Sequence, residues 1–129
     1  SPNLGVAPAV LGQGLAASTL ATGLSEAMNG ALSTRLAGEA GVSTFDLFGA
    51  VADIIADPAA YGLSDVSNAC LLGTCNASQY LFWDGIHPTA VAAAYLGDFA
   101  TAAVVPVPPA AILLVSAFAA LAGLRRKAA

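Results

Sequence analysis

The feature that most constrains the fold is a stripe of large apolar side chains repeated every four residues. It consists of Leu20, Leu24, Met28, Leu32 and Leu36. Because this spacing places the side chains on one helix face and polar residues cover much of the rest, the sequence predicts a long amphipathic helix. Gly38 and Gly41 supply the stop signals. Such a face is usually buried against a sheet, and the alternative is a surface that binds a partner.

The residues that follow predict alternating strand and helix. Residues 42–48 form a β-prone run between glycines and predict a strand, which indicates an α/β layer. Residues 50–56 predict a short helix that Asp57 and Pro58 end, and residues 90–99 predict another. Residues 59–79 are expected to form an irregular loop.

An acid–base pair is suggested by Asp84, which lies three positions before His87, the only histidine in 129 residues. A tight turn can bring the carboxylate onto one imidazole nitrogen, which fixes the tautomer and supports a positive charge on the ring. The alternative is a helix-entry turn in which Asp84 accepts backbone N–H groups and His87 only packs. The spacing alone leaves both interpretations open.

The wider string favours the catalytic interpretation. Residues 80–89 read YLFWDGIHPT, which closely resembles the last conserved block of the SGNH/GDSL serine hydrolases, a family of esterases, lipases and phospholipases. Residues 4–8, LGVAP, look like the segment after a central strand in that family. The resemblance implies a three-layer α/β sandwich with a mostly parallel sheet. It also implies an ester or lipid substrate, no cofactor or metal, and a Ser–His–Asp triad completed by Asp84 and His87.

The nucleophile of such a triad is missing from the sequence. The family's Gly-Asp-Ser motif does not occur, and Ser18, Ser25 and Ser43 stand in helix or strand contexts. We therefore expect residues 1–103 to be the C-terminal part of a hydrolase domain that is inactive alone and belongs to an active parent. The rival hypotheses are a non-catalytic, membrane-tethered surface protein with the same fold and a small membrane-anchored structural protein.

Charge and cysteine content argue against nucleic-acid binding and zinc binding and favour a disulfide. Apart from Arg125, Arg126 and Lys127, the chain carries one basic residue against eight acidic ones, which argues against nucleic acid as a partner. Cys70 and Cys75 lack the further ligands of a zinc site, so a disulfide-closed loop in an exported protein is expected.

Residues 104–129 predict a separate C-terminal segment. Prolines at 106, 108 and 109 lead an apolar run to Leu124, followed by the three basic residues, so residues 105–124 are expected to cross a membrane with the C-terminus in the cytoplasm. The alternative is a buried terminal helix. The layout resembles the VPLPA-type PEP-CTERM sorting signals, with Val-Pro-Pro in place of Leu-Pro-Ala. That resemblance implies export in a Gram-negative-type bacterium, inner-membrane anchoring, an exosortase-type peptidase as partner, and a final place at the cell surface or outside the cell.

Overall fold

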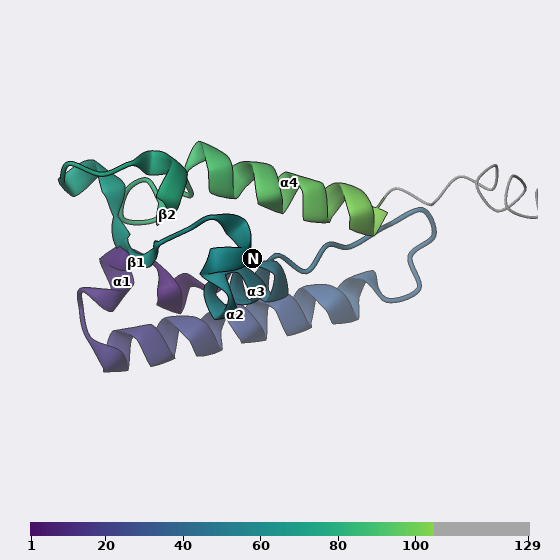
Figure 1. The fold of residues 1–129 in the computed structure, drawn as a ribbon. Helices are drawn as coiled ribbons and strands as arrows, with labels where there is room; N and C mark the ends of the chain where they lie inside the picture. Colours follow the sequence, from purple (N-terminus) through teal and green to yellow (C-terminus); the bar gives the residue numbers. More distant parts are fainter. Residues whose placement is uncertain (105–129) are drawn as a thin grey trace, which may run out of the picture.

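The computed structural model describes residues 1–104, apart from the side chain of Leu72 (Figure 1). The predicted span at 105–124 and the sorting tail therefore lie outside the described residues. Within residues 1–104, no helix is both long and apolar enough to cross a membrane. The described part is a small α/β structure with four α-helices and a two-stranded parallel sheet.

The helices are α1 (Pro8–Leu11), α2 (Leu15–Leu36), α3 (Leu47–Ala56) and α4 (Ala90–Val104), and the strands are β1 (Asp65–Ala69) and β2 (Tyr80–Phe82). Four short 3₁₀ turns, at Leu4–Val6, Pro58–Tyr61, Cys70–Leu72 and Ala77–Gln79, join them. Helices α2 and α4 run along opposite sides of the molecule with α3 between them, and the sheet lies at the end where α4 begins (Figure 1).

The core joins α3, β2 and α4. Its buried side chains are Ile54, Leu63, Leu81, Phe82 and Ala92. Tyr61 packs edge-on against Tyr95 and Phe99, with ring centroids 5.2 and 6.0 Å apart. Because burial of apolar area is the main favourable term in folding, this cluster anchors β2 and the start of α4, the two elements that flank the Asp84–His87 turn.

Two predictions about the middle of the chain are wrong in part. Residues 42–46 form no strand, because within residues 1–104 no other segment pairs with them to complete a ladder. Helix α3 begins instead at Leu47, where Asp46 Oδ1 accepts the Gly49 N–H at 3.0 Å. Conversely, the expected irregular stretch 59–79 contains β1, which pairs with β2 in parallel. The helices predicted at 50–56 and 90–99 are confirmed.

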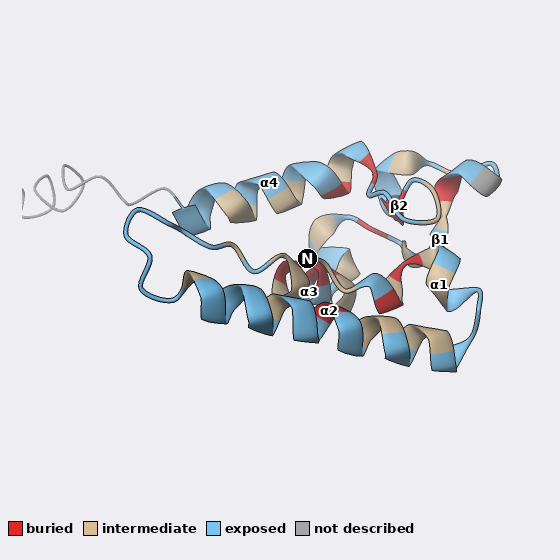
Figure 2. Ribbon diagram, turned by 180° about the vertical axis from the view of Figure 1, so that it is seen from behind, coloured by how far each residue is buried: buried red, intermediate tan, exposed pale blue. Residues whose placement is uncertain are grey.

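The long predicted helix is confirmed as α2, but the prediction that its apolar stripe is buried is wrong. Leu20 is 75% exposed, and Leu24, Met28 and Leu32 are each more than half exposed. Figure 2 shows much of α2 as exposed surface. The helix has no sheet against this face in the described part of the chain, so the stripe that should drive its packing remains in solvent.

The face of α2 that does pack is polar. Its Ser18, Thr22, Ser25 and Asn29 side chains bind residues 1–5: the Ser18 hydroxyl donates to Gly5 O at 2.8 Å, and Ser25 Oγ accepts the Leu4 N–H at 3.1 Å. A Cβ on Gly5 would overlap the backbone of Ser18 and the hydroxyl of Thr22, so glycine permits this close approach. Hydrogen bonds therefore hold the N-terminal segment on α2.

Substitution in the core should lower the stability strongly, whereas substitution on the stripe should change it little. Ile54→Ala removes a fully buried side chain and should lower the free energy of unfolding by about 2–5 kcal/mol, because it leaves a cavity. Leu24→Gln keeps helix propensity at an exposed site and should change it by less than about 0.5 kcal/mol. Urea unfolding followed by circular dichroism checks both, and a large loss in Leu24→Gln would show that the stripe is already covered in solution.

Candidate active site

The turn that carries Asp84 and His87 is held closed by backbone hydrogen bonds on both sides. The Trp83 N–H donates to His87 O at 2.8 Å, and the Thr89 N–H donates to Leu81 O at 2.9 Å. Phe82 and Pro88 form an antiparallel bridge. Because β2 belongs to the core, these bonds fix the base of the turn and leave residues 84–87 as its tip.

The Asp84 carboxylate organises the tip through both of its oxygens. Oδ1 accepts the N–H groups of Ile86 and His87 at 2.8 and 2.7 Å, and Oδ2 lies 2.8 Å from His87 Nδ1. The turn is therefore an Asx-type turn, as the alternative interpretation expects, but His87 does not only pack, because the same carboxylate is aimed at its exposed imidazole. The side chain of Asp84 is 32% exposed and that of His87 is 68% exposed.

These hydrogen bonds keep the Asp84 carboxylate ionised. The Ile86 N–H, then the His87 N–H and then the imidazole lower the pKa of Asp84 from 3.8 to about 2. At neutral pH the carboxylate is therefore ionised and can only accept, so a neutral imidazole must carry its proton on Nδ1. The lone pair of Nε2 is then free, and this nitrogen can accept a proton from a reacting group.

Two further elements support the turn. The Ala9 N–H, at the start of α1, donates to Gly85 O at 2.9 Å, and a Cβ on Gly85 would come within 3.0 Å of Ala9 Cβ. The Leu71 N–H, in the loop after β1, donates to Trp83 O at 2.7 Å. In the structure Cys70 and Cys75 form a disulfide across this loop, with their Cα atoms 5.5 Å apart.

Thr89 is a structural residue of the site that the sequence analysis did not single out. It is only 2% exposed, its hydroxyl donates to Tyr80 O at 2.7 Å, and its Oγ1 accepts the Ala92 N–H at 3.2 Å. It thus caps α4 and ties the helix to β2. A threonine directly before an alanine-rich helical run is an N-cap signal that sequence alone could have supplied.

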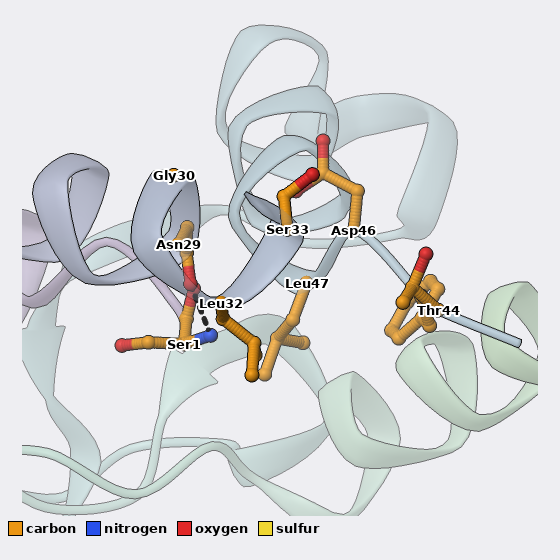
Figure 3. A pocket seen from close by; sticks show the side chains of 9 residues that line it. Ser1, Asn29, Gly30, Leu32, Ser33, Thr44, Asp46 and Leu47 are labelled. Atoms are coloured by element: carbon orange, nitrogen blue, oxygen red, sulfur yellow. Dashed lines mark hydrogen bonds between the residues drawn. The ribbon is translucent and has the colours of Figure 1, made fainter. Parts of the chain in front are cut away.

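Other candidate sites in the described residues lack this chemistry. Residues 1–104 contain no group of three or more His, Cys, Asp or Glu side chains that could hold a metal ion. A hollow of about 350 Å³ lies between the N-terminus, the second half of α2 and the start of α3 (Figure 3). There the Ser1 amino group donates to Asn29 Oδ1 at 2.6 Å, and the acid, Asp46, already caps α3. The lining of this hollow contains no histidine.

The fold and the site together describe an α/β protein with an exposed carboxylate–imidazole pair at the carboxyl end of a parallel strand. No family model matches the chain. The chain does show distant, partial similarity to GDSL esterase/lipases of Arabidopsis thaliana. One is 33% identical over 70 residues, which cover 42% of this chain and 19% of the relative. A second is 36% identical over 69 residues, with the same coverage, and a third is 42% identical over 60 residues, covering 35% and 16%.

This similarity links the chain to hydrolases and covers a limited region. The chain spans about a fifth of the length of the curated relatives that it matches. Within residues 1–104, the hydrogen-bond partner of the His87 ring is Asp84 alone, and the structure brings no serine hydroxyl to Nε2. The catalytic role of Asp84 and His87 therefore stays a prediction.

The Asp84 pKa provides a direct test of the turn. Because the folded value lies near 2 and the unfolded value near 3.8, the carboxylate stabilises the turn fully above about pH 4 and loses this effect as the pH falls through about 2. The ¹³C shift of the Asp84 carboxyl carbon should titrate with a midpoint near 2. A midpoint close to 3.8 would contradict these hydrogen bonds.

The Thr89 cap should be visible in unfolding experiments. Thr89→Ala removes the cap of α4 and leaves Tyr80 O without its partner, so the free energy of unfolding should fall by about 1–2 kcal/mol. Thr101→Ala is the matched control, because that exposed hydroxyl bonds only Gly97 O in its own helix. Equal effects of the two substitutions in urea unfolding would argue against a capping role.

Proposed function

We propose that this chain supplies the general base and its aspartate to the Ser–His–Asp triad of a serine ester hydrolase of the GDSL type. The observation that carries the proposal is the contact between Asp84 Oδ2 and His87 Nδ1, which leaves Nε2 free on an exposed ring. The partial similarity to plant GDSL esterase/lipases supports the same reaction class.

Each residue then has a defined task. His87 Nε2 removes the proton of the attacking serine and returns it to the leaving alcohol, after which water releases the acyl group by the same route. Asp84 holds the ring in the required tautomer and stabilises the imidazolium. Ser18 and Ser25 already bind backbone carbonyls of Gly5 and Ala21, which supports a nucleophile and oxyanion hole outside this chain. We expect the chain alone to be inactive.

The proposal includes a larger sheet. Residues 42–46 are β-prone but form no strand, and the apolar stripe on α2, which precedes them in the chain, is exposed. Both features fit a three-layer α/β sandwich in which further parallel strands pair with 42–46 and cover the stripe. Residues 1–103 would then be the C-terminal part of that domain.

The composition of residues 104–129 supports a membrane anchor in the proposed protein. Residues 105–124 are uncharged and precede Arg125, Arg126 and Lys127, a pattern that favours a membrane anchor with its basic end in the cytoplasm. Together with the VPLPA-like prolines, it supports handling of 104–129 by an exosortase-type peptidase in a Gram-negative-type bacterium. The hydrolase would then act at the cell surface or outside the cell on ester or lipid substrates.

The decisive experiment is fluorophosphonate labelling of the native protein in its host, read by size on a gel. We expect a labelled band larger than the 129-residue chain that contains this sequence, because the probe reacts only with an activated serine. His87→Ala should abolish labelling, and Asp84→Asn should slow it by roughly 10⁴-fold.

Asp98→Asn, which alters an exposed acid on α4, is the control and should label normally. A confirmed larger polypeptide that takes no label would exclude the triad and favour the non-catalytic tethered protein. Steady hydrolysis of a nitrophenyl ester by the isolated chain, lost in His87→Ala, would instead place the nucleophile within these residues.

A further inference from the structure

A groove of about 550 Å³ lies beside the Asp84–His87 turn. One wall is α1 with its C-cap, the other is the second half of β1, and the turn itself contributes Gly85. The lining residues are Pro8, Ala9, Leu11, Gly12, residues 67–69 and Gly85. This volume is within the range of about 300–1,000 Å³ that small-molecule sites occupy.

The groove lies at the edge of the sheet from which the Asp84–His87 turn extends. Strands β1 and β2 are parallel, so their carboxyl ends lie at one edge of the sheet, where ligands of α/β proteins bind. Strand β1 ends at Ala69 in the groove, and β2 runs directly into the turn. The hydrogen bond from the Ala9 N–H to Gly85 O joins the groove wall to the turn that carries His87.

The lining defines the chemistry of the ligand. All the lining residues are uncharged, and the α1 wall is apolar. The opposite wall is fixed because Asp65 accepts the backbone N–H groups of Ser67 and Asn68, at 2.9 and 2.8 Å, and the Asn68 side-chain amide at 2.8 Å. No basic group is present to hold a carboxylate or phosphate, whereas small residues leave space for a slender apolar chain.

We propose that this groove binds the acyl chain of a neutral ester, an inference that rests on the function proposed above. The alcohol must leave where His87 can protonate it, and the imidazole is not among the residues that line the groove. The acyl group stays attached through both steps of the reaction, so a groove that adjoins the turn of the base is of most use to it. Binding itself requires neither the serine nor His87.

The first test is a titration of the full ¹⁵N-labelled chain with methyl decanoate, followed by amide chemical shifts. Saturable shifts should cluster at Ala9, Gly12, Asn68 and Gly85 and should be retained in His87→Ala. The amides of Leu24 and Met28 on the exposed α2 stripe report non-specific apolar binding and should not move. Shifts confined to the stripe, or none, would overturn the proposal even where the triad is correct.

Matched variants test the position of the site. Ser67→Phe fills the groove and should weaken binding at least tenfold, whereas Ser78→Phe should change it less than twofold. The two serines are exposed and similarly placed, because each backbone N–H binds an Asp or Asn side chain two residues earlier. Gly12→Leu is a second blocking variant, since its φ of −62° suits any side chain. Equal binding by all three variants would exclude the groove.

A second measurement tests the acyl assignment in the labelled parent hydrolase. Ser67→Phe should shift preference among nitrophenyl esters toward shorter acyl chains and leave selectivity among methyl, butyl and octyl acetates unchanged. The reverse pattern would assign the groove to the alcohol and overturn the acyl assignment. If the parent shows no hydrolysis while methyl decanoate still binds the groove, the triad fails and the binding site stands.

Discussion

The candidate site depends on one carboxylate that does two things at once. Asp84 Oδ1 closes the turn by accepting two backbone N–H groups, and Oδ2 meets the imidazole. Folding of the turn and orientation of the base are therefore one event. The same bonds lower the pKa of Asp84 to about 2, so the group stays an acceptor at any pH where an esterase works. Within residues 1–104, the side-chain contact that orients the His87 ring comes from the same turn, while α1, β2 and the loop after β1 hold that turn in place.

Sequence reasoning succeeded where structure is local and failed where it depends on partners. The spacing of Asp84 and His87 and the periodicity of α2 involve near neighbours, so the contact and the helix follow from the residues themselves. A strand also needs another strand. Residues 42–46 have β-prone side chains but no partner in the described chain, whereas β1, which was not predicted, acquires one in β2. Parallel pairing is non-local and leaves little trace in a single segment.

Helix α2 shows why periodicity predicts a helix better than it predicts burial. The buried residue of α2 is Ser25, whose hydroxyl accepts from Leu4 N–H and donates to Ala21 O. A buried hydroxyl costs little when it is fully bonded, so a polar face can pack as well as an apolar one. The apolar stripe faces solvent instead, in a row longer than soluble proteins usually expose. Such a row indicates a surface suited to packing.

In the function proposed above, the exposure of the stripe and that of the imidazole have a related reason. His87 is oriented by its own turn, yet its ring is 68% exposed, and charges in water interact weakly. An Asp–His pair accelerates acyl transfer only when a nucleophile and oxyanion donors meet it in a site from which water is excluded. In the proposed domain, further strands would pair with residues 42–46 and cover α2. They would belong to the same layer as β2, whose carboxyl end carries the turn. In the proposed hydrolase, the same further strands would therefore complete both the fold and the active site. The Asp84–His87 turn can form without them, because its own hydrogen bonds close it.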